Sequence, residues 1–342
     1  MTKVDIIGGS LGGLSTAISI KEQNKSIDVI VHEKYKKIGY NHDGRRCGEA
    51  YTIEKEWNRW TPRKKSYYDE IRRAIVYIGE KKQEYTIKSG IAYILNRQEF
   101  ISQLGKQAIE LGVEIQTNHK IKSLSNLDGD YIVDASGCPS TIKRELNLNK
   151  GFKGVTYQQT IENSNYFISD TIKIYYIGRF GYYWIFPRDP KKKEVNVGIG
   201  VDKDFGYNLK NLLEEFKRKK NITGKVNYVT GGLVPIGLQR PFKNKNILFV
   251  GDTSAGSFPI SGQGIYRALL SGEVAGKCIA HNQVNRYPYI LNKMFIKWDV
   301  IYKLFRPINL ICTNINPNLA LKMSGYLIKY NAKASHQFDI KK

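Results

Sequence analysis

The stretch KVDIIGGSLGG, residues 3–13, decides the fold of this chain. It joins an apolar run that predicts a strand to a glycine-rich turn, and a helical pattern over residues 14–20 follows directly. A second apolar run, residues 27–31, ends just before Glu33. Strand, glycine turn, helix and strand in this order predict a βαβ unit at the start of a parallel sheet.

The glycine turn has the spacing of a dinucleotide-binding fingerprint at Gly8, Ser10 and Gly13, with serine at the middle position. The first glycine permits a tight turn and the last lets helix and strand pack closely. A phosphate at the start of the helix, near Leu11, would be stabilised by the helix dipole and by unpaired N–H groups. The carboxylate of Glu33, at the end of the second predicted strand, can accept hydrogen bonds from the ribose hydroxyls of a dinucleotide. The turn therefore predicts dinucleotide binding, although glycine turns also occur for purely structural reasons.

A second motif late in the chain indicates which dinucleotide. Asp252 follows an apolar strand, and Pro259 is followed by Gly262, Gly264 and Ile265, which open a helix that we expect over about residues 262–281. An aspartate at such a strand end accepts hydrogen bonds from ribityl hydroxyls, and the helix start faces the electron-rich end of a reduced flavin. The alternative is that Asp252 only caps a helix. Together with the N-terminal turn, the motif predicts FAD.

Three further motifs narrow the class. They are CGE at residues 47–49, YYWIFP at 182–187 with NVGIG at 196–200, and VDASG at 133–137. With them, the chain resembles FAD-dependent oxidoreductases of the p-hydroxybenzoate hydroxylase architecture, and more narrowly the geranylgeranyl reductase family. The resemblance spans residues 1–280, and the tail beyond them has no counterpart that we can align.

The resemblance implies an α/β fold in which a Rossmann-like FAD-binding domain is interleaved with an antiparallel β-sheet substrate domain, plus a C-terminal helical segment. The β-rich sequence between residues 153 and 201 agrees with this. We expect the FAD-binding domain to comprise residues 1–50, 96–150 and 241–284. The sheet domain would comprise residues 51–95 and 151–240, and the helical tail residues 285–342.

The activity that the resemblance implies is saturation of isoprenoid double bonds, as on the geranylgeranyl chains of archaeal ether lipids. An isolated alkene is not polarised, so hydride transfer from reduced flavin needs a proton from a positioned acid. Cys47 is the candidate near the flavin, and its alternative role is that of a small buried residue. Glu49 either shares the proton path or pairs with Arg45 or Arg46.

The remaining candidates contact cofactor or substrate. The candidate FAD-binding residues are Gly8, Ser10, Leu11, Gly13, Glu33, Arg45, Arg46, Cys47, Arg97, Asp252, Gly262, Gly264 and Ile265. Tyr182 and Trp184 share one face of a predicted strand with Phe186, because alternate residues of a strand point the same way. These aromatics either line a tunnel for the substrate or pack in the core.

The 342 residues carry a formal charge of +23, because 54 lysines and arginines face 31 acidic residues. The excess is spread along the chain, with ten basic against two acidic residues, or +8, over residues 281–342. It is explained by solvated lysines, by a phosphorylated ligand or by an anionic membrane surface. Nucleic acid is the weakest explanation, because no nucleic-acid-binding motif accompanies the charge.

The four cysteines lie far apart and form no metal-ligand spacing with histidine, so we predict no metal site and a reducing compartment. We find no signal peptide and no apolar run long enough to span a membrane. We therefore expect a cytoplasmic protein. Peripheral contact with the inner face of the membrane is the alternative, because Phe295, Trp298, Tyr302 and Phe305 form one helical stripe among lysines. That stripe either packs on the body of the protein or lies on a membrane surface.

Three other functions stay open. A flavin monooxygenase acting on an aromatic or quinone-like substrate shares the architecture, and a flavin halogenase has a motif similar to residues 182–187. A non-enzymatic lipid carrier would not need the intact cofactor motifs. The electron donor, ferredoxin or NADPH, and the form of the prenyl substrate are also open.

Overall fold

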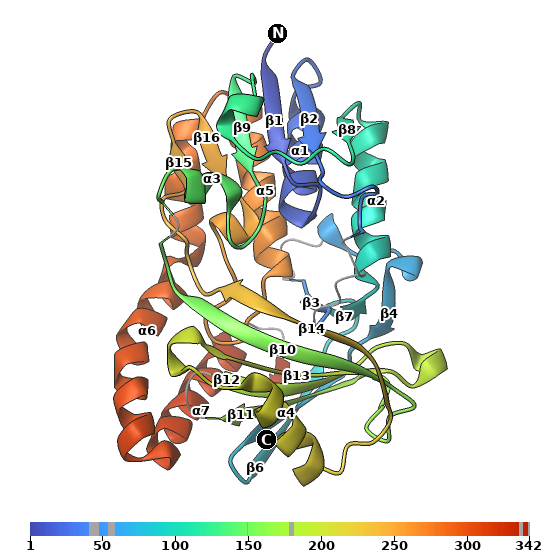
Figure 1. The fold of residues 1–342 in the computed structure, drawn as a ribbon, viewed down its shortest axis with the longest axis vertical. Coiled ribbons are helices and arrows are strands. Elements are labelled where there is room, and N and C mark those ends of the chain that lie inside the picture. Colours follow the sequence, from blue (N-terminus) through green and yellow to red (C-terminus); the bar gives the residue numbers. More distant parts are fainter. Residues whose placement is uncertain (41–47, 54–58, 149, 178–180, 335–337, 341–342) are drawn as a thin grey trace. The chain divides into compact units, whose positions relative to one another are not determined.

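The opening residues fold as the sequence predicts. In the computed structural model, β1 (Lys3–Ile7) leads through the glycine turn into α1 (Leu11–Gln23), and β2 (Asp28–His32) follows (Figure 1). The structure describes residues 1–342 except 41–47, 54–58, 149, 178–180, 335–337 and 341–342. The chain divides into two units, one of residues 1–45, 97–152 and 234–301 and the other of residues 46–96, 153–233 and 302–342.

The first unit is built on a six-stranded sheet with the order β15-β16-β9-β1-β2-β8. All neighbouring strands are parallel except β15, which is antiparallel to β16. Numbered along the chain, the parallel strands run 3-2-1-4-5, the order of dinucleotide-binding sheets. Besides β1, β2 and α1, the elements of this unit are α2 (Arg97–Glu110), β8 (Glu114–Gln116), β9 (Tyr131–Asp134), α3 (Thr141–Glu145), β15 (Lys243–Asn244), β16 (Ile247–Phe249) and α5 (Ile265–Ala280).

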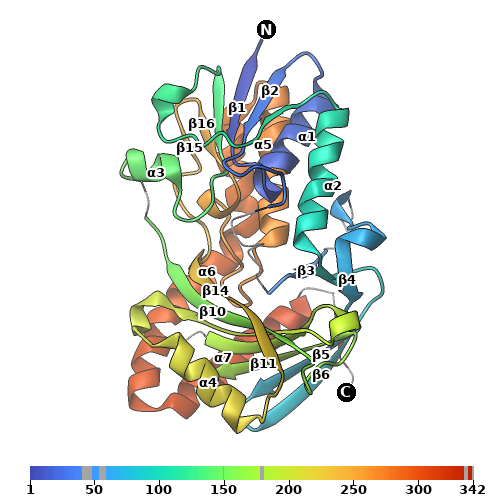
Figure 2. The same cartoon turned by 45° about the vertical axis from the view of Figure 1, so that its right-hand side comes forward.

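Helices α1 and α5 pack against each other closely, and Figure 2 shows them side by side. A Cβ on Gly272 would lie 2.0 Å from Ser15 Oγ, and one on Gly276 would lie 2.6 Å from Thr16 O. Glycine is required at both positions because the backbones approach within the space of a side chain. The segment before α5 is thereby held beside the glycine turn before α1.

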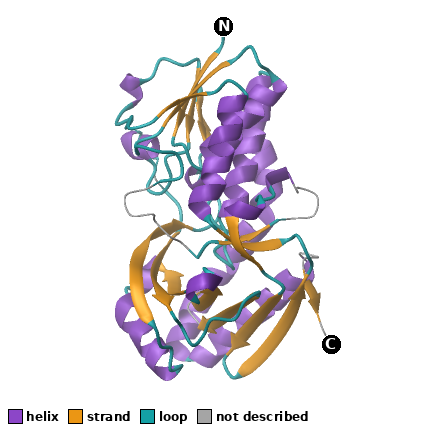
Figure 3. Cartoon of the chain, turned by 90° about the vertical axis from the view of Figure 1, so that its right-hand side faces the viewer, coloured by secondary structure: helices purple, strands orange, loops and turns teal. Residues whose placement is uncertain are grey.

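The second unit contains an eight-stranded sheet with the order β14-β10-β13-β12-β11-β5-β6-β17, and a three-stranded sheet with the order β3-β7-β4 (Figure 3, strands in orange). In the large sheet β11 pairs with β5 in parallel, whereas the pairs β10–β13, β13–β12, β12–β11, β5–β6 and β6–β17 are antiparallel. Its strands are β5 (Arg73–Ile78), β6 (Lys81–Ile87), β10 (Lys153–Glu162), β11 (Thr171–Ile177), β12 (Gly181–Pro187), β13 (Val195–Asp202), β14 (Lys225–Pro235) and β17 (Phe338–Ile340). The small sheet comprises β3 (Ala50–Thr52), β4 (Tyr67–Glu70) and β7 (Ala92–Leu95).

Each face of the large sheet belongs to a different core. On one face, α4 (Leu209–Lys219) buries Leu213 and Phe216 against the strands, and Tyr183 of β12 stacks on Phe216 at 4.1 Å between ring centroids. On the other face, Trp184 and Phe186 join a cluster with residues of β5 and β7. Alternate residues of β12 therefore serve opposite faces, as the sequence predicts.

The tail forms two helices, α6 (Tyr287–Ile315) and α7 (Pro317–Ala334), rather than one continuous helical segment. Pro317 occupies the first position of α7, where a missing N–H costs nothing. The aromatic stripe predicted from the sequence faces inward: Phe295 is buried under Arg267, and the buried Tyr302 donates its hydroxyl to Asp202. The packing alternative is therefore correct for this stripe. Across the described residues, no helix combines the length and the hydropathy needed to cross a membrane.

The mixed α/β class with a helical tail is confirmed. The sequence missed β14, because its glycines and alternating exposed residues resemble a loop, and it missed the small sheet within residues that lack strong periodicity.

Candidate functional site

The glycine turn has the geometry of a phosphate cradle. Gly8 has φ of +104°, and a Cβ there would lie 2.6 Å from the carbonyl oxygen of Ala135. A Cβ on Gly13 would lie 2.0 Å from Gly8 O, so only glycine lets α1 approach β1. Ser10 is the N-cap of α1 and, among the described residues, makes no side-chain capping hydrogen bond. The first N–H groups of α1, beginning at Leu11, are thus left for a phosphate.

Glu33 organises this turn from the end of β2. Its buried carboxylate accepts hydrogen bonds from the backbone N–H of Gly9 at 2.8 Å and of Tyr35 at 2.9 Å. The side chain therefore holds the glycine turn against the segment that follows β2. Because a carboxylate oxygen accepts more than one hydrogen bond, the ribose role predicted from the sequence is compatible with these contacts.

We expect Glu33→Ala to weaken FAD binding about ten- to a hundredfold. The variant removes two charge-assisted hydrogen bonds to the turn, and such bonds contribute roughly 1.5–3 kcal/mol each. The measurement is a fluorescence titration of FAD with apoprotein, and Glu110→Ala, an exposed glutamate of α2, is the matched control. Equal affinity of both variants and the wild type would contradict this role.

The late glycine motif lies next to the first one. A Cβ on Gly12 would lie 3.0 Å from Val250 Cγ1 and 3.5 Å from Gly251 Cα, so the two loops are in contact. Gly264 is the N-cap of α5, and its Cβ position lies 3.8 Å from Asp252 Oδ1. Burial raises the pKa of Asp252, and the positive charge of Arg97 at the start of α2 opposes that rise. The structure thus brings both cofactor motifs to one end of the first sheet.

A buried arginine that the sequence did not single out holds the late loop in place. Arg267 of α5 donates from Nε to the carbonyl oxygens of Ala255 at 3.0 Å and Gly256 at 3.2 Å. Its guanidinium lies over the ring of Phe295, 4.1 Å from the centroid. Burial lowers the pKa of Arg267 to about 10, and Asp299 opposes that shift. The side chain thus fixes the turn between Asp252 and α5.

In the second unit, the aromatic motif on β12 and the glycine motif on β13 form one structure. The register places Gly198 opposite Trp184, Gly200 opposite Tyr182 and Asn196 opposite Phe186. A Cβ on Gly198 would lie 2.2 Å from Trp184 Cζ2, so the indole occupies the space of the missing side chain. Glycines at these positions therefore let the aromatic residues lie flat on the neighbouring strand.

The aromatic side chains are largely core residues. Trp184 and Phe186 are buried, and the indole N–H of Trp184 donates to Gln158 Oε1 at 3.0 Å. Tyr182 packs against Tyr176 and Trp184, and burial raises its pKa. Gly48 lies on this cluster, since its Cβ position is 3.3 Å from Phe186 Cε2. Gly48 of the Cys-Gly-Glu motif thus lies against the aromatic face of β12.

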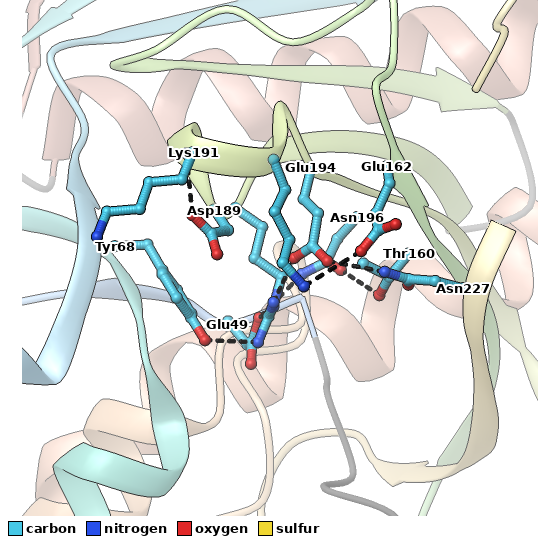
Figure 4. A network of polar contacts seen from close by, with 11 residues as sticks. Glu49, Tyr68, Thr160, Glu162, Asp189, Lys191, Glu194, Asn196 and Asn227 are labelled. Atoms are coloured by element: carbon cyan, nitrogen blue, oxygen red, sulfur yellow. Dashed lines mark hydrogen bonds and ion pairs between the residues drawn. The ribbon is translucent and has the colours of Figure 1, made fainter. Parts of the chain in front are cut away.

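A buried ion network joins these motifs (Figure 4). Arg188, the residue after the Phe-Pro of β12, donates from Nε to Glu49 Oε2 at 2.8 Å. Its other nitrogens donate to Glu194 and to the hydroxyl of Tyr68, the latter at 2.7 Å. Asn196 donates to the same oxygen of Glu49 at 3.1 Å. The network therefore ties Glu49 to both strands of the aromatic and glycine motif.

The network fixes the position of Glu49. This residue has φ of +62°, a conformation that costs a non-glycine residue energy and is often found at functional sites. Thr160 donates to Asn196 Oδ1 at 2.7 Å, which turns the amide nitrogen of Asn196 toward Glu49. Burial alone would lower the pKa of Arg188, but Glu49, Tyr68 and Glu194 raise it overall. Arg188 therefore stays a cation beside Glu49.

Three predicted residues, Arg45, Arg46 and Cys47, lie outside the described residues. Among the described residues, the ion partner of Glu49 is Arg188, which sequence reasoning missed together with Asn196 and Glu194. The signal was the position of Arg188, directly after the Tyr-x-Trp-x-Phe-Pro motif. For the described residues, no group of histidine, cysteine and acidic side chains suits a metal ion.

A family model matches the part of the chain that contains the aromatic and glycine motifs of β12 and β13. Residues 154–234 match the family model described as the geranylgeranyl reductase catalytic domain. The matched segment contains β12 and β13, and with them the aromatic motif, Arg188 and Asn196. This part of the second unit is therefore similar to the catalytic domain of geranylgeranyl reductases.

Curated relatives cover most of the chain. A digeranylgeranylglycerophospholipid reductase of Methanocella arvoryzae is 26% identical over 311 residues, covering 81% of this chain and 77% of the relative. The protein of the same name from Methanocaldococcus jannaschii is also 26% identical, covering 82% and 78%. The resemblance of the sequence to geranylgeranyl reductases, an FAD-dependent oxidoreductase class, is therefore confirmed.

Solved structures that cover most of the chain support its fold. A geranylgeranyl bacteriochlorophyll reductase-like protein from Thermoplasma acidophilum has a TM-score of 0.77 and 21% identity, covering 90% of this chain and 88% of that protein. A flavin-dependent brominase has a TM-score of 0.69 and 18% identity, covering 94% and 93%. A further neighbour was solved in complex with FAD. The chain has an FAD-binding fold, and the glycine cradle, Glu33 and the start of α1 described above fit this cofactor.

Proposed function

We propose that this protein is an FAD-dependent reductase that saturates C=C bonds of geranylgeranyl chains, on membrane ether lipids of the archaeal type. The observation that carries the proposal is the ion network, because it joins the Cys-Gly-Glu segment to the aromatic and glycine motifs of the reductase domain. The names of the relatives, digeranylgeranylglycerophospholipid reductases, support the substrate class.

Each motif has a proposed role. FAD, when bound and reduced, supplies the hydride. We assign the FAD-binding candidates named from the sequence to this cofactor, Cys47 to the proton supply, and Tyr182, Trp184 and Phe186 to the apolar chain. The sequence left open whether Glu49 shares the proton path or pairs with an arginine. We assign it the second role: paired with Arg188, it positions the Cys-Gly-Glu segment and does not serve as the acid.

An isolated alkene needs a dry site as well as an acid. Water near the reacting carbons would compete for the cationic character that develops at the more substituted carbon. The aromatic face of β12 supplies apolar surface and rings that tolerate positive charge. We also propose the domain division expected from the sequence. The electron donor is ferredoxin or NADPH, and the enzyme acts at an anionic membrane surface.

The test is an anaerobic incubation of the purified protein with dithionite-reduced FAD and a detergent-solubilised geranylgeranyl glycerolipid. We expect the lipid to gain about 2 Da for each double bond reduced, and the gain to disappear without FAD. Cys47→Ser should lower the turnover number while FAD remains bound. An unchanged lipid, although the bound flavin is reduced normally, would contradict the proposal and favour oxygen-dependent chemistry on aromatic substrates.

A further inference from the structure

The outward face of the two tail helices carries a continuous set of exposed aliphatic side chains. Leu304, Ile308, Ile311 and Ile315 of α6 are between 46% and 79% exposed. Their spacing of four, three and four residues places them on one stripe of the helix. Soluble proteins rarely leave such contiguous apolar surface in water.

Two further exposed side chains lie on α7, the helix that packs against α6. Leu319 and Tyr326 of α7 are 47% and 76% exposed. The two helices pack through their other faces, where Asn309 donates to Ala320 O at 3.2 Å and to Ser324 Oγ at 3.2 Å. We call the set Leu304, Ile308, Ile311, Ile315, Leu319 and Tyr326 the docking face.

The charge around the docking face selects its partner. Between Asp299 and Asp339 the sequence has no acidic residue, whereas Lys303 and Lys322 are exposed on the same two helices. Asp204, which pairs with Arg306 of α6, is the exposed acidic side chain that the described contacts place beside this part of the helix. An apolar stripe on helices with exposed lysines is complementary to a surface with anionic headgroups over hydrocarbon. A protein partner or a second copy of this basic chain would place like charges together.

We propose that the docking face of α6 and α7 binds an anionic lipid bilayer. Leu304, Ile308, Ile311 and Ile315 enter the boundary between headgroups and acyl chains, and Tyr326 lies at headgroup level, where its polar end stays wet. Lys303 and Lys322 meet the anionic headgroups. This proposal rests on the proposed function only in naming the surface from which the substrate lipid is taken.

The inner face of the tail explains why these side chains are outside. Tyr302 and Arg306 both donate hydrogen bonds to Oδ2 of Asp202. The Tyr302 hydroxyl lies 2.8 Å from this oxygen and Arg306 Nε lies 2.6 Å from it. On α7, a Cβ at Gly325 would lie 3.1 Å from Ile78 Cγ2, so this helix is seated on β5. Since polar anchors and close packing fix the inner face, the aliphatic stripe cannot turn inward without breaking them.

The test is co-flotation of the FAD-loaded protein with vesicles of phosphatidylcholine containing about 30% phosphatidylglycerol, without substrate lipid. We expect the wild type to float with these vesicles and much less with pure phosphatidylcholine. Ile308→Ser with Ile311→Ser should lower the partition coefficient roughly tenfold or more, and Lys303→Gln and Lys322→Gln about fivefold each. The matched controls are Ile109→Ser with Ile168→Ser and Lys120→Gln with Lys122→Gln, exposed residues elsewhere, which should float like the wild type.

Each variant is also assayed on detergent-solubilised lipid, which needs no docking. A variant that no longer floats with vesicles but turns over detergent-solubilised lipid like the wild type supports the docking face. This result stands even if the wild type proves to act on a different substrate than the one proposed. A wild type that stays unbound, or equal flotation of the serine variant and the wild type, would overturn the docking face. A dimer that dissociates in the serine variant, without vesicle binding by the wild type, would overturn it in favour of a second copy.

Discussion

Arg188→Met should destabilise the protein by about 3–5 kcal/mol, the usual cost of leaving a buried charge without its partner. Arg188 lies between Glu49 and Glu194, both nearly fully buried, and no solvent replaces the guanidinium when it is removed. Turnover should fall further than the loss of stability requires, because the function proposed above gives Glu49 a positioning role. The measurements are urea unfolding and lipid reduction on the FAD-loaded variant.

Two further variants show whether the effect of Arg188→Met comes from the unpaired buried carboxylates. Lys192→Met removes an exposed ion pair with Glu162, 3.3 Å long, and should change stability by less than about 1 kcal/mol. Adding Glu49→Gln and Glu194→Gln to Arg188→Met removes the uncompensated charges and should recover much of the stability, yet not the turnover. Unfolding of Arg188→Met within about 1 kcal/mol of the wild type would show that the network contributes little.

Gly198→Ala should have the second largest effect. The new Cβ would lie 2.2 Å from Trp184 Cζ2 and 2.4 Å from Cε2, and real Cβ atoms do not approach so closely. The indole must move, which breaks its 3.0 Å hydrogen bond to Gln158. Overpacking of this kind costs about 1–3 kcal/mol. Urea unfolding measures the change, and so does the difference in tryptophan emission between the variant and the wild type, since Trp184 is one of four tryptophans.

Gly200→Ala is the matched control on the same strand and face. Its Cβ would lie 3.3 Å from Thr156 Cγ2 and 3.5 Å from Trp184 Cζ3, so small shifts accommodate it. We expect a stability change below about 1 kcal/mol and an unchanged emission spectrum. Equal effects of the two alanines would mean that loss of glycine flexibility, rather than the indole, explains the result.

Local patterns predicted the parts of the fold that depend on neighbours in sequence. The glycine turn, Glu33 and the alternation along β12 need only a few adjacent residues, and the structure has them as expected. The helix expected from about residue 262 begins at Ile265, directly after the late glycine motif.

The rest depends on contacts between distant residues. Glu49 and Arg188 are 139 positions apart, so no local pattern could pair them. The aromatic stripe of the tail was visible as a stripe, but which side of α6 faces the body depends on Asp202 of β13. A sequence shows that a helix is amphipathic, and only the fold shows which face meets the protein.

The close fit of Trp184 over Gly198 has a consequence for how relatives of this chain diverge. Because one position holds a ring in the space that the other leaves empty, neither residue can change size alone without cost. We therefore expect the two positions, fourteen apart, to vary together: a relative with a small residue at position 184 is free to have a side chain at position 198. Covariation between them across an alignment would therefore identify the strand register without any structure.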